Sequence, residues 1–249
     1  MNSSAQSSPA DMIPWPDAGM ARAFELLEPL TPARHVVIDV GAHNGETLDI
    51  AASRLAGGAH YIALEPNPGT FALLTARAAR YEGTAMQATC VQAAAGPVEG
   101  TTSFNATRAS AVAGVLPPVA GLGERVPSGD HDILEQVTVP MVTIDGLIAR
   151  EGITMVDLLK VDAEGYDLEV LRGAIAALRE HRVRVVLCEV FFVAYREGQA
   201  FFWDIASFLQ EAGYQFVNLY DTRDTSQGRL YTGNGLWVSP EVAGANGYL

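Results

Sequence analysis

The sequence predicts an α/β protein with an open, doubly wound and mostly parallel sheet of about seven strands. Short runs rich in valine, isoleucine and leucine alternate with amphipathic stretches, as in sheets whose two faces are covered by helices. Near its end the chain has two apolar runs, 214–220 and 234–240, separated by a polar stretch with glycine, which predict a closing antiparallel hairpin. About five strand–helix units are too few for a closed barrel of eight.

Each element follows from its local pattern. Residues 20–30 repeat apolar residues at helical spacing and end before Pro32, so we expect a helix there. Strands of the main sheet are expected over the apolar runs 35–40, 60–65, 88–95, 155–162 and 183–190. Helices are expected over the amphipathic runs 46–55, 71–81, 167–180 and 201–213. Residues 1–34 would then be a lead-in and a helix, followed by a single domain over 35–249.

One segment interrupts this alternation. Residues 101–142 begin and end with strand-like runs, but a stretch with many glycine, proline and serine residues separates them. A loop of this length inside a compact domain is usually functional or disordered. We therefore expect an inserted hairpin around 101–142, with a lid over 105–135.

Composition restricts the partners of the protein. The 249-residue chain carries a net charge of −13, which disfavours nucleic acid because phosphate backbones are bound by lysine and arginine. Cys90 and Cys188 lie in apolar runs, as buried reduced thiols do. We see neither an export signal nor an apolar run of about 20 residues, so we expect a cytoplasmic protein without a membrane partner. The N-terminal helix could pack across a dimer, so a homodimer is a further expectation.

The first strand leads into a glycine-rich loop in the stretch "VVIDVGAHNGET", residues 36–47. Gly41 and Gly45 have G-x-x-x-G spacing, unlike the G-x-G-x-x-G of a dinucleotide-binding loop. Asp39 and Glu46 flank the loop without a nearby lysine or arginine, so a pyrophosphate would meet negative charge. A ligand with a positive centre, a small carboxylate and a ribose fits better, and S-adenosylmethionine is such a ligand.

A second acid supports this choice of ligand. Glu65 ends the second expected strand in "YIALEPNP", where a carboxylate can accept hydrogen bonds from both hydroxyls of a ribose. In a doubly wound sheet, ligands bind beyond the carboxyl ends of the strands. Asp39 and Glu65 close consecutive strands, so both are expected at that edge.

Five stretches resemble, in order, the FkbM family of S-adenosylmethionine-dependent methyltransferases: "VVIDVGAHNGET", "YIALEPNP", "VQAAAG", "VTIDGL" and "LLKVDAEGYDLEVLRGA". The phrase K-V-D-A-E-G with the following E-V-L-R-G is the most specific of them. The resemblance implies a Rossmann-like class I methyltransferase fold and S-adenosylmethionine as cofactor. The residues expected around the cofactor are Asp39, Gly41, His43, Asn44 and Gly45 at the methionine end, Glu65 and Pro66 near the ribose, Gln92 and Ala93 at the adenine, and Asp162 beside the cofactor.

The chemistry is expected at the ends of the fourth and fifth strands. Methyl transfer to an alcohol needs a base, because the pKa of an alcohol lies far above 7. Asp162, Glu164 and Glu189 are the candidates, and neighbouring carboxylates raise one another's pKa toward the range of a base at neutral pH. Which glutamate acts stays open. The same acids could bind a divalent metal, but neither the residues nor the resemblance demands one.

Four residues are expected on the acceptor side. Tyr195 and Arg196 follow the fifth strand in an aromatic stretch and could stack on a sugar or hold an acidic group. Arg108 and Arg125 lie in the expected lid and could close over a substrate.

These features predict an S-adenosylmethionine-dependent O-methyltransferase that acts on a hydroxyl of a sugar-containing or polyketide-like small molecule. The O-linkage and the substrate class come from the resemblance. A nicotinamide-dependent oxidoreductase is the alternative among enzymes, and a cofactor-binding module without catalysis is the alternative outside them.

Overall fold

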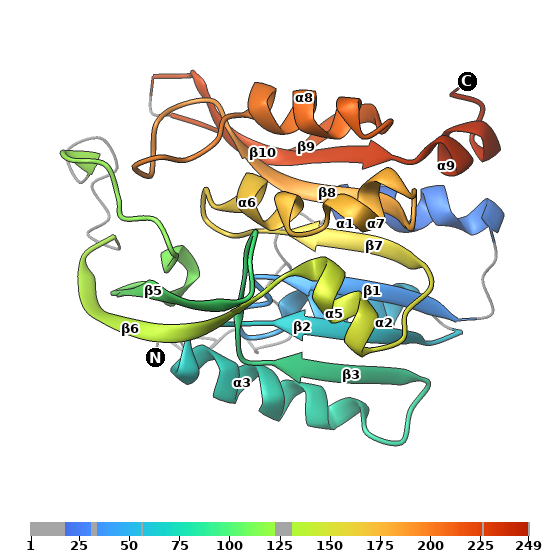
Figure 1. Cartoon of the computed structure of the whole chain (residues 1–249), viewed down its shortest axis with the longest axis horizontal. Coiled ribbons are helices and arrows are strands. Elements are labelled where there is room, and N and C mark those ends of the chain that lie inside the picture. Colours follow the sequence, from blue (N-terminus) through green and yellow to red (C-terminus); the bar gives the residue numbers. More distant parts are fainter. Residues whose placement is uncertain (1–17, 31–33, 56, 123–130, 226, 249) are drawn as a thin grey trace, which may run out of the picture.

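A computed structural model describes residues 18–30, 34–55, 57–122, 131–225 and 227–248. Its main sheet has seven strands in the order β3-β2-β1-β7-β8-β10-β9 (Figure 1), and β10 runs antiparallel to both of its neighbours. The strands are β1 (His35–Val40), β2 (Ala59–Leu64), β3 (Met86–Val91), β7 (Val156–Val161), β8 (Val183–Phe191), β9 (Gln215–Asp224) and β10 (Leu230–Val238). The expected open sheet with a closing antiparallel hairpin is confirmed.

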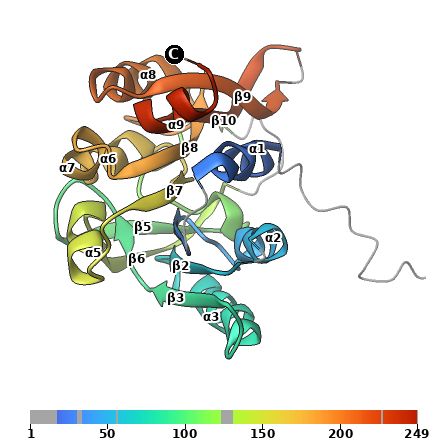
Figure 2. The ribbon, with the colours of Figure 1, turned by 90° about the vertical axis from the view of Figure 1, so that its right-hand side faces the viewer.

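Helices cover both faces of the sheet (Figure 2). One face carries α5 (Ile144–Arg150), α6 (Asp167–Arg172), α7 (Ile175–Arg179) and α8 (Phe202–Glu211). The other carries α1 (Ala18–Leu27), α2 (Glu46–Arg54), α3 (Pro68–Ala78) and α9 (Pro240–Ala245). Successive strand residues therefore enter different cores: Val37 packs under α1 and α2, whereas Ile38 packs under α5 and its neighbours. This explains why the strands read as continuous apolar runs.

The structure divides two elements that the sequence predicts as continuous. The expected helix over 167–180 is split into α6 and α7, and Gly173 lies at the break. A Cβ on Gly173 would lie 2.1 Å from the carbonyl oxygen of Gly96, so the backbone passes too close for any other residue. The expected strand over 88–95 ends at Val91, and its last two residues leave the main sheet as β4 (Ala94–Ala95). The short helices α5 and α9 were not expected, because so few residues show little periodicity.

A second, three-stranded sheet is inserted between β3 and α5. It has the order β4-β6-β5, with β5 (Gly100–Thr107) antiparallel to β6 (Ile133–Val142). Figure 1 shows this hairpin at the edge where the parallel strands of the main sheet end. The inserted hairpin is therefore confirmed, and its strands extend into both ends of the region expected to be a loop.

The described part of the expected lid packs against the segment that follows β8. The N–H of Val119 donates to the carbonyl of Tyr195 at 3.1 Å, and the N–H of Glu197 donates to the carbonyl of Pro117 at 2.9 Å. Leu122 packs in a small cluster with Phe191 and Tyr195. This part of the lid therefore has a defined docking place, while residues 123–130 lie outside the described ranges.

The N-terminal helix belongs to the same core as the sheet. Its first two N–H groups, those of Ala18 and Gly19, each donate at 3.1 Å to the carboxylate of Asp221 on β9, and its apolar residues pack over β8 and β10. Within the described ranges, every helix is too short or too polar to cross a membrane.

Candidate functional site

A cleft of about 640 Å³ lies at the carboxyl ends of the parallel strands, between the main sheet and the residues that follow β5. Six of the residues expected around the cofactor line it: Gly41, His43, Glu65, Pro66, Ala93 and Asp162. Four others do not: Asp39, Asn44, Gly45 and Gln92. The first group therefore lies together in one cleft, whereas the second group lies outside its lining, and Gln92 is exposed.

Gly41 and Gly45 shape the loop between β1 and α2. Gly41 has φ +75°, and a Cβ there would lie 1.9 Å from the carbonyl oxygen of Asp162, so only glycine lets the loop pass against the end of β7. Gly45 has φ +89° and is the N-cap of α2. The N–H groups of the first turn of α2 have no intrahelical partner and can bind a carboxylate. The side-chain oxygen of Asn44 is buried beside this turn, without a hydrogen-bond partner among the described residues.

Glu65 lies at the end of β2 with both carboxylate oxygens held. Oε2 accepts from the N–H of His43 at 3.0 Å, and Oε1 accepts from the N–H of Asn67 at 2.8 Å. The side chain lines the cleft although the residue is only 6% exposed. Burial raises the pKa of Glu65 to about 7, so the group changes charge near neutral pH. Each oxygen keeps a lone pair that can accept a hydroxyl hydrogen.

Asp39 is completely buried under the floor of the cleft. Its Oδ2 accepts from the hydroxyl of Tyr61 at 2.5 Å, and its Oδ1 lies 3.1 Å from Nζ of Lys160. The same Nζ lies 3.4 Å from Oδ2 of Asp162. The expectation that Asp39 lines the methionine end is therefore corrected: its carboxylate anchors a lysine, and the lysine lines the cleft.

Lys160 is a site residue that sequence reasoning missed. Burial alone would lower its pKa, but the negative charges of Asp39 and Asp162 outweigh burial and raise it, so the ammonium stays charged. The available signal was a lysine inside the otherwise apolar run "LLKV", since lysine is rarely buried without a partner.

The three candidate bases meet in the cleft. Carboxylate oxygens of Asp162, Glu164 and Glu189 lie within 4.8 Å of one another. Glu164 adopts φ +53° directly after β7, and Glu189 reaches the same place from β8. Burial raises the pKa of Glu164 to about 7, although the nearby Arg196 opposes this rise. Burial, with the charges of Asp162 and Glu164, raises the pKa of Glu189 well above its ordinary value.

Among the described residues, Glu189 differs from the other two acids in that its side chain has only a shared hydroxyl as a partner. Its Oε1 lies 3.2 Å from the hydroxyl of Thr232, and that hydroxyl also donates to the carbonyl of Val190 at 2.8 Å. Its Oε2 is buried without a hydrogen-bond partner among the described residues. Because a hydroxyl has one hydrogen, Thr232 cannot donate to Oε1 of Glu189 and to the carbonyl of Val190 at once. The raised pKa and the scarce donors both favour the protonated form of Glu189.

The acid cluster has the oxygen chemistry that magnesium and calcium prefer. One of its oxygens is already bound, because Oε2 of Glu164 lies 2.9 Å from Nη2 of Arg196. A guanidinium in contact with the cluster weakens its attraction for a divalent cation, so we assign no metal to these residues.

The residues expected on the acceptor side lie elsewhere. Arg108 is exposed and pairs with Asp132 at 3.6 Å, and Arg125 lies outside the described residues. Tyr195 is buried, stacked on Phe191 with ring centroids 5.3 Å apart. Arg196 is buried as well. Because Arg108, Tyr195 and Arg196 do not line the cleft, the expectation that they contact the substrate is corrected.

Other elements supply the far side of the cleft. The lining residues there are Met20 of α1, Asp221 and Arg223 of β9, Thr232 and Asn234 of β10, and residues 109–115 of the segment expected to be a lid. Residues 109–115 lie within the expected lid, but sequence reasoning missed the residues of α1, β9 and β10, because no local pattern shows that these elements reach the cleft. The available signal was that Thr232 and Asn234 are two residues apart, the spacing at which strand residues face the same side of a sheet.

Known proteins resemble this chain. The hexuronic acid methyltransferase AglP of Haloferax volcanii is 29% identical over 157 residues, which are 62% of this chain and 55% of that protein. The crystal structure of methyltransferase FkbM from Methylobacillus flagellatus KT superposes with a TM-score of 0.54 at 18% identity, over 83% of this chain and 44% of that one. This likeness shows the fold. The chain spans about half the length of each of these two proteins.

The family model of the methyltransferase FkbM domain matches residues 39–216. This span begins at the end of β1 and ends at the start of β9. It contains the glycine loop, Glu65 and all three clustered acids. The chain belongs to the FkbM methyltransferase family.

Proposed function

We propose that this protein is an S-adenosylmethionine-dependent O-methyltransferase that acts on a hydroxyl of a sugar-containing or polyketide-like molecule. The observation that carries the proposal is the placement of Asp162, Glu164 and Glu189 in the same cleft as the glycine loop and Glu65. The cofactor, when bound, supplies a methyl group carried on a positively charged sulfur.

The residues of the cofactor end fit this ligand. Gly41 and the first turn of α2 offer close backbone approach and free N–H groups to a carboxylate, and Glu65 offers oxygens to a ribose. The negative charges around Asp162 suit a cationic sulfur. A nicotinamide dinucleotide fits less well, because the nearest buried cation, Lys160, is already paired with Asp39 and Asp162.

The acid cluster supports a hydroxyl acceptor over a carboxylate acceptor. The relative AglP is named for hexuronic acid, which offers both kinds of oxygen. A substrate carboxylate would meet the carboxylates of Asp162, Glu164 and Glu189, and like charges repel. A hydroxyl can instead donate a hydrogen bond to one of them. It also needs a base, which a carboxylate does not.

Glu164 is the better candidate for that base. Its pKa is raised to about 7, so a large fraction is ionised at neutral pH and can accept the proton of an acceptor hydroxyl. Burial and its acidic neighbours raise the pKa of Glu189 well above its ordinary value. In this proposal Glu189 is the acid that carries a proton and donates a hydrogen bond within the cleft. Asp162, which is paired with Lys160, completes the negative wall.

The free thiols of Cys90 and Cys188 support a reducing compartment such as the cytoplasm as the place of this reaction.

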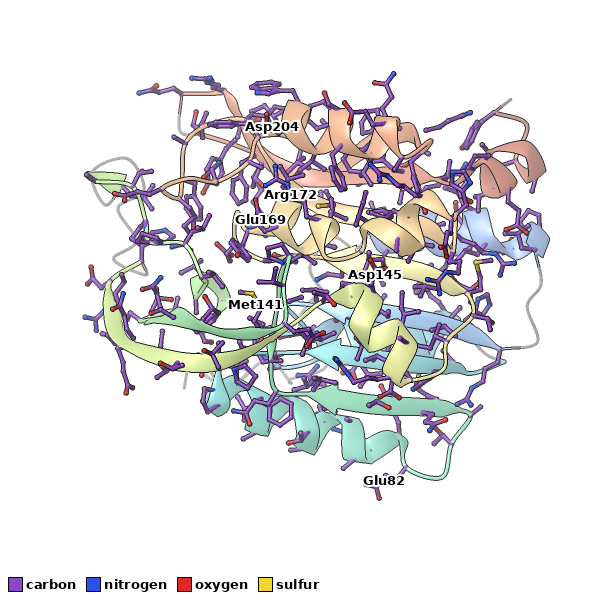
Figure 3. All side chains as sticks on the ribbon, viewed as in Figure 1. Glu82, Met141, Asp145, Glu169, Arg172 and Asp204 are labelled. Atoms are coloured by element: carbon purple, nitrogen blue, oxygen red, sulfur yellow. The ribbon has the colours of Figure 1, made fainter. Side chains whose placement is uncertain are left out.

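The first test is calorimetric titration of the full chain with S-adenosylhomocysteine, NAD and NADP. We expect binding of S-adenosylhomocysteine only. The Glu65→Ala variant should weaken it about 10-fold or more, because hydrogen bonds to a charged group contribute about 1.5–3 kcal/mol. Glu82→Ala is the matched control, since Glu82 is an exposed acid on the surface of the protein (Figure 3). Preference for a dinucleotide would refute the methyltransferase proposal.

The second test separates an enzyme from a binding module. Mass spectrometry of hydroxyl-bearing sugars incubated with S-adenosylmethionine should detect a methyl ether with the wild-type protein. The triple variant Asp162→Asn, Glu164→Gln, Glu189→Gln should form none. A methyl ester found on a uronic acid, in place of the ether, would contradict the hydroxyl assignment.

A further inference from the structure

Arg196 is buried to an extent that its place in a loop does not predict. It follows β8, yet the residue is only 1% exposed. Its Nη2 donates to Oε2 of Glu164 at 2.9 Å and also to the carbonyl of Val112. Its guanidinium carbon lies 4.6 Å from the ring centre of Tyr195. The buried cation is therefore surrounded by one carboxylate, one carbonyl and one aromatic face.

The backbone around Arg196 is folded to deliver this side chain. The side-chain oxygen of Gln199 accepts from the N–H groups of Tyr195 and Arg196 at 2.8 and 2.5 Å. The amide nitrogen of Gln199 donates to the carbonyl of Val193 at 3.1 Å. Together these hydrogen bonds close the segment 193–199 into a turn.

Glycine at position 165 leaves room for this turn. Gly165 has φ +90°, and a Cβ there would lie 3.2 Å from Cγ of Arg196. The Glu-Gly pair of the K-V-D-A-E-G phrase therefore has two effects. The left-handed backbone of Glu164 places its carboxylate in the cleft, and Gly165 admits the arginine that contacts it.

The other partner of Arg196 belongs to the lid. Val112 lies in the short helix η4 (Ser110–Val112) and lines the cleft. Two residues later, Gly114 packs on Glu164: a Cβ on Gly114 would lie 3.1 Å from Cβ of Glu164. The lid segment 109–115 thus touches both the candidate base and the guanidinium that holds it.

We propose that Arg196 is a positioning residue that couples the closure of lid segment 109–115 over the cleft to the placement of Glu164. The proposal rests on the proposed function, in which Glu164 accepts the proton of the acceptor. When the lid covers the cleft, Val112 and Glu164 share one guanidinium, and water is kept from the ion pair. One oxygen of the carboxylate is then held by Arg196, and the other is left for the acceptor.

The charges around Glu164 explain why this coupling would affect its ionisation. Carboxylates of Asp162, Glu189 and Asp167 face it from the end of β7, from β8 and from the start of α6, and the phenols of Tyr195 and Tyr231 also interact with it. The charges of Asp162 and Asp167 disfavour a charged Glu164, whereas Arg196 is a cation that contacts it. Lid opening that admits water to this ion pair would weaken the favourable interaction of Glu164 with Arg196.

The experiment compares Arg196→Met with Arg172→Met in the full chain loaded with S-adenosylhomocysteine. Arg172 is the matched control, because it pairs with Glu169 on α6 (Figure 3) and both side chains are more exposed than those of the Arg196–Glu164 pair. The first readout is hydrogen–deuterium exchange of the amides of 109–115. The second is the carboxyl ¹³C titration of Glu164, assigned with Glu164→Gln.

For Arg196→Met we expect amide exchange in 109–115 at least about 10-fold faster and a Glu164 pKa higher by about one unit or more, since an opposite charge at this range shifts a carboxyl by about 1–3 units. Arg196→Lys, which keeps the positive charge, should return the pKa of Glu164 most of the way to its wild-type value. If Arg196→Met changes neither the amide exchange of 109–115 nor the pKa of Glu164, the proposal is overturned. Changes of the same size in Arg172→Met would also overturn it. If Arg196→Met does not fold, amide exchange of 109–115 in Arg196→Lys is compared with the wild type. Faster exchange supports the proposal, and unchanged exchange overturns it.

Neither readout needs an acceptor. If both changes appear while no methyl transfer is found, the coupling stands and the proposed reaction fails. If methyl transfer is found and both readouts are unchanged, the reaction stands and the coupling fails.

Discussion

Replacing Gly41 by alanine should both destabilise the protein and impair cofactor binding. The added Cβ would lie 1.9 Å from the carbonyl oxygen of Asp162, more than an ångström inside the 3.0 Å that real Cβ atoms keep. The left-handed backbone adds a penalty of about 1–2 kcal/mol for any residue with a Cβ. Forced overpacking typically adds about 1–3 kcal/mol. We therefore expect Gly41→Ala to lower the free energy of unfolding by about 2–5 kcal/mol.

Gly83 provides a control that separates the two contributions. It has the same φ, +75°, but a Cβ there meets nothing within 4 Å. Gly83→Ala should lower the free energy of unfolding by only about 1–2 kcal/mol and leave the affinity for S-adenosylhomocysteine unchanged. Urea unfolding followed by tryptophan fluorescence measures the stabilities, because Trp237 is buried in the core, and calorimetry measures the affinity. Equal destabilisation by the two substitutions would refute the argument that close approach to β7 requires glycine.

Three further predictions concern the charges of the site. Lys160→Met should lower the free energy of unfolding by about 3–5 kcal/mol, because it leaves Asp39 charged and buried without its cation; urea unfolding that matches the wild type would contradict this. Glu65, Glu164 and Asp167 each have a pKa raised to about 7, so the folded state binds protons more tightly than the unfolded chain. The stability that they contribute is present below about pH 4 and is lost as pH rises toward 7 and beyond. The urea midpoint of the ligand-free protein should therefore fall between pH 5 and 8, and a flat or rising midpoint would show that other groups dominate. Methyl transfer should persist in EDTA because a guanidinium already binds the acid cluster, and loss of activity that added magnesium restores would show a required metal.

Much of this site follows from where strands end. Glu65, Asp162 and Glu189 were each recognisable as acids that close an apolar run, and a parallel sheet gathers such ends at one edge. Their meeting in one cleft was therefore predictable from their positions at the ends of the expected strands. The part of the wall that β9 and β10 supply was not, because these strands reach the cleft through tertiary contacts that leave no local pattern.

Arg196 shows why side-chain direction was the harder part. An arginine in a loop after a strand is ordinarily exposed, and Arg196 was expected to contact the substrate because it follows the fifth strand on the acceptor side. Its burial depends on Gln199, which folds the turn, and on Gly165, which leaves space for it. Each of these residues is unremarkable by itself in the sequence. Only the fold brings them to the same place, so no pattern within one segment could have indicated the contact with Glu164.

The two buried cations explain how three carboxylates can share one cleft. Lys160 is paired with Asp162 and Arg196 with Glu164, whereas the described neighbours of Glu189 offer it only the hydroxyl of Thr232. Three ionised carboxylates at this separation would repel strongly, which favours the protonated form of Glu189, the acid without a cation among its described neighbours. The cleft then holds an acid ready to accept a proton beside one able to donate a hydrogen bond. In the proposed function, an acceptor hydroxyl uses both, because its oxygen must be oriented by a donor while its hydrogen is removed by a base.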